Sequence, residues 1–196
     1  MAKAPVPGAV KTRLIPALGP AGAARLAERF LRECVAQAIE ADIGEVELCC
    51  APDTKHAVFV ELARDARVTL TVQGDGDLGQ RMARAIERTL ASGSRAILIG
   101  TDAPALDAAV LRSACRALDA ADAVFAPAAD GGYALVGLRR SAPRLFEDIP
   151  WSTPRVMALT RQRLAESGIV QVELPQLFDV DEPADLVHVP AHWLRY

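Results

Sequence analysis

The stretch Arg95–Leu106, RAILIGTDAPAL, decides the fold. Its first part, Ala96–Ile99, is an unbroken apolar run, too short for a helix and without a polar face. Such a run predicts a strand buried on both sides within a parallel sheet. Gly100 ends the run, and Thr101 and Asp102 place polar groups just beyond the carboxyl end of the strand. Open α/β sheets bind their ligands at this end of their strands, so the stretch predicts an α/β fold and the location of a site.

Asp102 has two interpretations from its position alone. Its carboxylate suits a hard cation such as Mg²⁺, which prefers oxygen donors. Alternatively, Asp102 caps the helix that we expect to begin near Asp107, because aspartate is favoured at helix N-termini. The sequence around Pro104 is consistent with both, since proline keeps the chain extended before a helix.

Length and composition favour one domain over residues 1–196. The chain is 51% hydrophobic, enough for a full core. No apolar run approaches the roughly 20 residues that span a bilayer, and the start lacks the apolar region of a secretory signal. We therefore expect a cytoplasmic protein without membrane insertion. A net charge of −3 gives no general attraction to nucleic acid, and oligomeric state is left open.

The opening segment AKAPVPGAVKTRLIPALGP, residues 2–20, is rich in proline and glycine and predicts a long ordered loop, neither helix nor central strand. All charged side chains up to residue 27 are basic, and they include Lys3, Lys11 and Arg13. A loop stiffened by proline holds such cations around a polyphosphate at a lower entropic cost. The alternative is an ordinary solvated surface loop.

The rest of the chain alternates between predicted helices and strands, which implies parallel pairing. Helices are expected over residues 21–41, 57–66, 78–91, 107–120 and from Pro154 to Gly168; strands are expected over 46–50, 68–73, 96–99, 123–126, 133–138 and 170–174. The last strand is followed by the acidic segment FDVDEPAD, residues 178–185.

The segment GDGDLG, residues 74–79, matches the dinucleotide-binding pattern G-x-G-x-x-G. However, Asp75 and Asp77 would place two carboxylates against a pyrophosphate. The motif also requires an acidic residue at the end of the following strand, and this chain has none there. The segment therefore favours a tight turn that brings backbone close to a ligand.

Two further segments are candidates for contact with a substrate. Asp130, Gly131 and Gly132 combine a carboxylate with bare backbone, which suits a bound sugar or phosphate. Because Asp-Gly is also a strong turn signal, an ordinary hairpin turn is the alternative. Trp151 either stacks on a sugar or base or belongs to the core.

Four separated motifs together resemble a known family. They are AKAPVPGAVKTRL, GDGDLGQRM, GTDAPAL with PAADGGYALVGL, and WSTP with DVDEPADL. Over nearly the whole chain they resemble the radical-SAM/selenodomain-associated transferase family, "transferase 1", which includes arsenosugar-biosynthesis-type glycosyltransferases. The resemblance implies the nucleotide-diphospho-sugar transferase superfamily and a GT-A fold. This fold is a Rossmann-like three-layer α/β/α sandwich with a mostly parallel central sheet.

The resemblance also implies roles for individual residues. Asp102 and Asp181 would hold Mg²⁺ or Mn²⁺, with Asp179 as a substitute, and Asp102 and Asp130 would be catalytic. The residues implied in nucleotide binding are Lys3, Pro5, Gly8, Lys11, Arg13, Gly74, Gly79, Arg81 and Thr101. The residues implied in binding the sugar or acceptor are Gly131, Gly132 and Trp151.

The start of the chain departs from this family pattern. Members begin with an apolar strand that runs into the proline-rich loop, whereas only Met1 and Ala2 precede Lys3 here. We therefore expect a truncated first strand, and we interpret the assigned start as lying downstream of the natural one. The alternative is a sheet that lacks a central strand.

These features lead to three functional hypotheses. The first is a metal-dependent transferase that passes a sugar from a nucleotide-sugar to a small-molecule acceptor, with Asp130 as the base. The second is a nucleotidyltransferase that joins a nucleoside triphosphate to a phosphorylated small molecule and releases pyrophosphate. The third is a nucleotide-binding or regulatory protein without activity.

Overall fold

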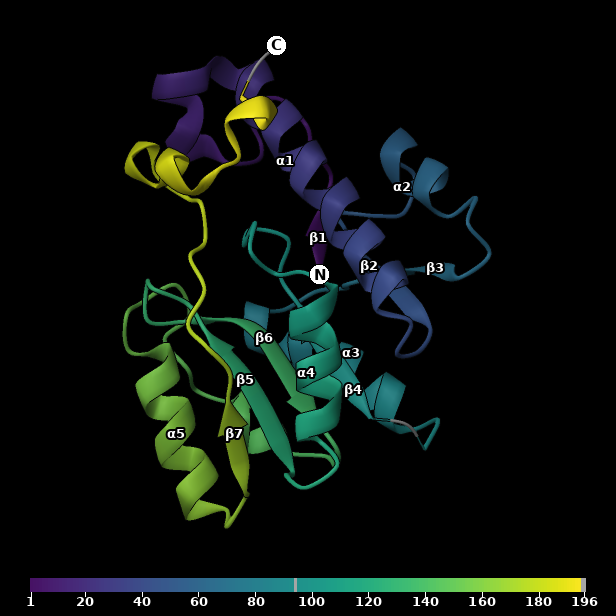
Figure 1. The fold of residues 1–196 in the computed structure, drawn as a ribbon, viewed down its shortest axis with the longest axis vertical. Helices are drawn as coiled ribbons and strands as arrows, with labels where there is room; N and C mark the ends of the chain where they lie inside the picture. The colour runs from purple at the N-terminus through teal and green to yellow at the C-terminus, as the bar shows by residue number, and fades with distance from the viewer. Residues whose placement is uncertain (94, 195–196) are drawn as a thin grey trace.

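The computed structural model describes residues 1–93 and 95–194, and Figure 1 shows their arrangement. The strands are β1 Ala2–Lys3, β2 Val46–Ala51, β3 Val68–Val72, β4 Ala96–Ile99, β5 Ala123–Pro127, β6 Tyr133–Leu138 and β7 Gln171–Glu173. The helices are α1 Ile15–Ala41, α2 Ala57–Leu62, α3 Leu78–Leu90, α4 Ala108–Ala117 and α5 Val156–Glu166. Short 3₁₀ turns cover Thr12–Leu14, Pro143–Leu145, Pro183–His188 and Ala191–Trp193.

The strands form two sheets, which confirms the α/β class. A three-stranded sheet has the order β1-β2-β3 with parallel pairing throughout. A four-stranded sheet has the order β4-β6-β5-β7, in which β5 and β7 are parallel. Strand β6 is antiparallel to both β4 and β5. The expectation that Ala96–Ile99 is a strand buried on both sides in a parallel sheet was therefore wrong: β4 is an edge strand of which only Ala96 is fully buried, and an apolar sequence does not specify which way its neighbour runs.

The two sheets meet where β1 lies beside the end of β4. Strand β1 is short, as expected, and pairs with β2 through Ala2 opposite Cys50 and Lys3 opposite Ala51. The amino group of Met1 donates a hydrogen bond to the Ile99 carbonyl oxygen at 2.9 Å. Beyond this contact, a groove of about 840 Å³ separates the remainder of β2 from β4.

Helices cover both faces of the four-stranded sheet, giving three layers (Figure 1). On one face, α3 and α5 contribute Ile86 and Leu164 to a cluster that includes Phe125 of β5. On the other face, Leu111 of α4 packs in a second cluster with Val124 of β5. A third cluster joins α1 and α2 to the three-stranded sheet. Its buried side chains include Leu31, Val35, Phe59 and Leu48.

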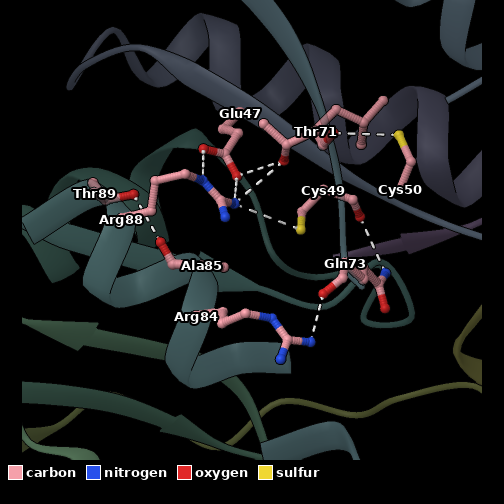
Figure 2. Close-up of polar contacts among 10 residues, drawn as sticks. Glu47, Cys49, Cys50, Thr71, Gln73, Arg84, Ala85, Arg88 and Thr89 are labelled. Atoms are coloured by element: carbon pink, nitrogen blue, oxygen red, sulfur yellow. Dashed lines mark hydrogen bonds and ion pairs between the residues drawn. The ribbon is translucent and has the colours of Figure 1, made fainter. Parts of the chain in front are cut away.

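Helix α3 is also attached to the three-stranded sheet by polar contacts, which Figure 2 shows. Arg88 forms an ion pair with Glu47 of β2, with Nε 3.0 Å from Oε2. Arg84 donates to the Gln73 carbonyl oxygen at 2.9 Å. The buried Gln73 amide donates to the carbonyl oxygens of Ala2 at 2.9 Å and Cys49 at 3.1 Å. These contacts connect the two sheets through α3.

The opening segment contains more regular structure than we expected. Thr12–Leu14 is a 3₁₀ turn, and helix α1 begins at Ile15 rather than near residue 21. Gly19 breaks the helix with φ 68° and ψ 166°. Pro16 is tolerated because it lies in the first turn, where a backbone N–H has no partner within the helix. The prediction that these residues form only a loop was therefore wrong.

The C-terminal segment packs against the start of α1. In Figure 1 the yellow end of the chain lies beside the purple start of the helix. Val180 and Trp193 are buried in one cluster with Leu14 and Phe30. This packing brings the acidic segment next to the basic opening segment, although about 170 residues separate them. Among the described residues, the model has no helix of sufficient length and hydropathy to cross a membrane.

Candidate active site

A cavity of about 560 Å³ lies beyond the carboxyl ends of β1, β3 and β4. Ten of the predicted site residues line it: Lys3, Lys11, Arg13, Thr101, Asp102, Asp130, Gly132, Trp151, Asp179 and Asp181. Pockets for small ligands have volumes of roughly 300–1,000 Å³. The cavity therefore has a suitable size for a nucleotide, and it is located where open α/β sheets bind ligands.

Asp102 does not cap helix α4. The cap is Asp107, whose carboxylate accepts a hydrogen bond from the Val110 N–H at 2.9 Å. Asp102 instead lies in the extended segment after β4 and lines the cavity with its side chain half exposed. The capping alternative is thereby excluded, and the carboxylate is available for chemistry in the cavity.

Asp181 is placed beside Asp102 by backbone contacts. The N–H of Val180 donates to the Asp102 carbonyl oxygen at 3.0 Å. The Asp185 carboxylate then accepts from the N–H groups of Asp181 at 3.0 Å and Glu182 at 2.7 Å. These bonds hold the acidic segment in one conformation, so two carboxylates from distant parts of the chain face the same space.

Lys11 joins the two carboxylates. Its Nζ lies 2.8 Å from Asp102 Oδ1 and 2.9 Å from Asp181 Oδ1, and it also donates to the Val180 carbonyl oxygen at 2.7 Å. Burial favours the neutral amine and would lower the pKa of Lys11. The attraction of Asp102 and Asp181 outweighs burial, so the pKa lies above its ordinary value. Lys11 is therefore a fixed positive charge at neutral pH.

Among the described residues, Lys3 and Arg13 are the other basic side chains that line the cavity. Lys3 Nζ donates to the nearby Ala9 carbonyl oxygen, at 2.7 Å. Arg13 is 65% exposed, and its guanidinium is 3.7 Å from Glu182. Exposed ion pairs of this kind contribute about 0–1 kcal/mol, so both side chains can turn toward an anion at little cost.

The donor set fits a divalent metal ion that arrives with phosphate. In residues 1–93 and 95–194, no group of three or more His, Cys, Asp or Glu side chains is arranged to hold a metal. Asp102 and Asp181 are two carboxylates, each with Oδ1 bound to Lys11. Because Mg²⁺ is commonly held by one or two carboxylates plus substrate phosphates, this pair suits a shared ion rather than a permanent protein-only site.

The segment with Asp130 is a hairpin turn between β5 and β6 that also borders the cavity. The Gly132 N–H donates to Asp130 Oδ1 at 2.8 Å, and the Gly131 N–H donates to the Ala128 carbonyl oxygen at 3.1 Å. Gly131 has φ +91°, and a Cβ there would lie 2.4 Å from the Pro154 carbonyl oxygen. The segment is a hairpin turn, and it can still contact a bound sugar or phosphate, because Asp130 and Gly132 line the cavity.

Asp179 has a raised pKa. The main cause is burial, and the negative charge of nearby Asp130 adds to it. A carboxyl whose pKa is higher in the folded than in the unfolded protein binds its proton more tightly when folded. Its ionisation therefore reduces stability as pH rises above the ordinary aspartate value, until the folded pKa has been passed.

Replacement of Asp179 by asparagine should remove this cost. We expect Asp179→Asn to melt at a higher temperature than the parent protein at pH 7, by a few degrees, with a smaller difference at pH 4. Thermal unfolding of both proteins from pH 4 to pH 8 measures the difference. A constant difference at all pH values would contradict the assignment.

Six predicted site residues do not line the cavity: Pro5, Gly8, Gly74, Gly79, Arg81 and Gly131. Residues 74–77 form the expected tight turn, and Leu78 and Gly79 begin α3. The turn ends at the helix cap Asp77, which forms a reciprocal capping box with Gln80. Arg81 donates back to the Gly76 carbonyl oxygen at 2.9 Å. Gly79 is buried, and a Cβ there would lie 2.3 Å from the Phe146 carbonyl oxygen.

The cavity also contains side chains that sequence reasoning missed. Gln73 lines it and connects three strands by hydrogen bonds, and its position as the last residue of a predicted strand was the available signal. The hydroxyl of Tyr133 is buried, which raises the pKa of the phenol, and it has no hydrogen-bond partner among the described atoms. Tyr133 contacts Trp151 edge-on, with ring centroids 6.4 Å apart. Trp151 thus packs on the core and borders the cavity.

Solved structures with the same fold are known. A protein from Desulfovibrio desulfuricans G20, whose assignment as a nucleotide-diphospho-sugar transferase is provisional, has 29% identity and a TM-score of 0.85. The match covers 94% of this chain and 81% of that one. CMP:2-keto-3-deoxy-manno-octonic acid synthetase, solved with CTP, has 15% identity and a TM-score of 0.56, over 82% of this chain and 85% of the other. At that identity the second likeness shows the fold alone.

The chain is an α/β protein with the fold of the D. desulfuricans protein, and its cavity lies at the strand ends. A sequence-family model, described as "Uncharacterized protein conserved in bacteria (DUF2064)", matches residues 34–153, more than half of the chain. The chain therefore belongs to the DUF2064 family. A comparison with curated proteins finds no match.

Proposed function

We propose that this protein is a metal-dependent transferase that takes a sugar from a nucleotide-sugar and passes it to a small-molecule acceptor. The observation that carries the proposal is the composition of the cavity, which is lined by the cations Lys3 and Arg13 and by the pair Asp102–Asp181. Cations suit the phosphates of a nucleotide donor, and the two carboxylates suit a metal ion shared with those phosphates. The likeness to the D. desulfuricans protein supports this choice.

Each group has a distinct task in this proposal. Lys3 and Arg13 bind the donor phosphates, and Asp102 and Asp181 hold Mg²⁺ or Mn²⁺, which would neutralise charge on the departing phosphate. Asp130 lines the same cavity from the hairpin turn and would accept the proton of an attacking hydroxyl. The relationship to the radical-SAM/selenodomain-associated transferases, including the arsenosugar-biosynthesis type, belongs to this proposal.

A nucleotidyltransferase is the second candidate. Lys3 and Arg13 suit a triphosphate as well as a diphosphate, and the synthetase with the same fold was solved with CTP. In that reaction the attacking phosphate is already anionic, so Asp130 would not be needed as a base. The requirement for Asp130 therefore separates the two reactions.

A turnover screen tests both candidates. The purified protein is incubated with Mg²⁺ or Mn²⁺ and a set of nucleotide-sugars or nucleoside triphosphates, together with candidate acceptors. Glycosyl transfer is supported if the parent protein releases a nucleoside diphosphate from a nucleotide-sugar and Asp130→Asn does not. Release of pyrophosphate from a triphosphate, retained in Asp130→Asn, supports nucleotidyl transfer. Metal-dependent binding without turnover of any donor would support an inactive nucleotide-binding protein.

Arg13 provides a test of whether the basic side chains of the cavity bind nucleotide phosphates. We expect Arg13→Gln to weaken nucleotide binding by about tenfold, which corresponds to about 1.4 kcal/mol and is typical for loss of a hydrogen bond from a charged group. The melting temperature should not change, because the contact of Arg13 with Glu182 is long and exposed. Titration calorimetry measures the affinity, with exposed Arg64→Gln as the matched control. Equal affinity in both variants would remove Arg13 from the site.

A further inference from the structure

The ammonium group of Lys11 has a complete set of partners. An ammonium has three N–H donors, and Nζ of Lys11 has three acceptors within 2.9 Å: the Val180 carbonyl oxygen and one carboxylate oxygen each from Asp102 and Asp181. Lys11 was expected to bind nucleotide phosphates. In this structure all three N–H groups of Lys11 are used, so Lys11 cannot donate a hydrogen bond to a phosphate while it stays between the two carboxylates.

The backbone and the surroundings hold Lys11 in this position. Its side chain is only 6% exposed, whereas those of Asp102 and Asp181 are 49% and 44% exposed. The ring of Phe30 lies beneath the ammonium, with 5.7 Å between Nζ and the ring centroid. Lys11 also has a left-handed backbone, with φ 46° and ψ 42°, which a non-glycine residue adopts only when its surroundings impose it.

The position of Lys11 conflicts with simultaneous binding of a divalent ion. The ammonium and the ion would compete for the same two carboxylates and would repel each other at short range. Phosphate oxygens in the cavity would provide Lys11 with new acceptors once it leaves the carboxylates. Displacement of Lys11 is therefore easier when a phosphate is present than when a metal ion arrives alone.

We propose that Lys11 is a tethered cation that occupies the Asp102–Asp181 pair in the nucleotide-free protein and must be displaced before a divalent metal ion can bind there. Metal and nucleotide then enter together, with Lys11 moving from the carboxylates to a phosphate. The metal is excluded until a donor is present. This proposal rests on the proposed function, because it concerns the same metal and the same donor.

The test uses Mn²⁺ alone, followed by electron paramagnetic resonance of the free ion, so it requires neither a donor nor turnover. We expect weak binding to the parent protein and at least about tenfold tighter binding to Lys11→Met. Lys11→Arg keeps the charge and should resemble the parent protein. Lys3→Met is the matched control, because it removes one positive charge from the same cavity but not from between the carboxylates. It should change the affinity much less than Lys11→Met.

The outcomes separate this inference from the proposed function. Equal or weaker Mn²⁺ binding by Lys11→Met, or an equal gain in Lys3→Met, overturns the inference even if the turnover screen succeeds. Tighter Mn²⁺ binding by Lys11→Met alone supports it even if no donor is turned over. If Lys11→Met is unfolded in buffer, Mn²⁺ should restore a cooperative thermal transition. The inference is also overturned if Mn²⁺ does not restore this transition and the milder variant Lys11→Gln binds Mn²⁺ with the same affinity as the parent protein.

Discussion

Asp102→Ala and Asp181→Ala are each expected to abolish metal-dependent nucleotide binding, with affinity reduced by about 100-fold or more, equivalent to about 2.8 kcal/mol. Each variant removes half of the only carboxylate pair proposed to hold the shared metal ion. Both variants should stay folded, because Lys11 keeps the other carboxylate and the Val180 carbonyl oxygen as partners. Loss of binding would therefore reflect loss of a ligand and not loss of structure.

Titration calorimetry with Mg²⁺ and a nucleotide identified in the turnover screen measures this effect. Asp119→Ala is the matched control, since Asp119 is an exposed carboxylate that pairs with Arg95 and does not line the cavity. Its affinity should equal that of the parent protein. Parent-like affinity in either Asp102→Ala or Asp181→Ala would remove that residue from the proposed metal site.

Gly79→Ala is expected to destabilise the protein by about 3 kcal/mol, even though alanine ordinarily favours a helix over glycine. Gly79 lies in the first turn of α3, where an added Cβ would be 2.3 Å from the Phe146 carbonyl oxygen and 2.6 Å from Trp151 Nε1. A backbone oxygen cannot move aside as a flexible side chain can, so the whole helix or the segment before Trp151 must shift.

Thermal unfolding measures the effect of Gly79→Ala, and the melting temperature should fall by roughly 6–12 °C. Gly100→Ala is the control for replacing a glycine. A Cβ at Gly100 would be 3.9 Å from its nearest neighbour, the Ala134 carbonyl oxygen, and its φ needs no left-handed backbone. Its melting temperature should change little. An unchanged melting temperature in Gly79→Ala would show that α3 has room to adjust.

Local sequence patterns predicted most elements to within a few residues. The helix expected over residues 107–120 is observed as α4, Ala108–Ala117, because such an element is specified mainly by its own residues. The short polar run after Ile99 correctly predicted a cavity at that strand end, since this position depends on the fold class alone. The same reasoning located Asp102. Asp130 was suggested by its Asp-Gly-Gly segment and Asp181 by the family resemblance, and the structure brings all three to one cavity.

Features that depend on distant contacts were not predictable in this way. The antiparallel pairing of β4 with β6 has no local signature, because both directions bury the same apolar side chains. The contact of Lys11 with Asp181 joins residues 170 positions apart, so the motif that contains Lys11 shows only its charge. Likewise, the role of Gly79 depends on the Phe146 carbonyl oxygen, which belongs to a different part of the fold.

The groove between β2 and β4 has a consequence for the interior of the molecule. In β4, residues alternate between those that bond to β6 and those that turn away from it. The Gly100 N–H bonds to Ala134, whereas the Ile99 carbonyl oxygen bonds to Met1 on the other side. The backbone of Ile97 must then turn toward the groove as well, and a polar group there needs water as its partner. We therefore expect water to reach the middle of the molecule along this groove, and the slowest amide hydrogen exchange to be found in β5 and β6, away from the junction of the two sheets.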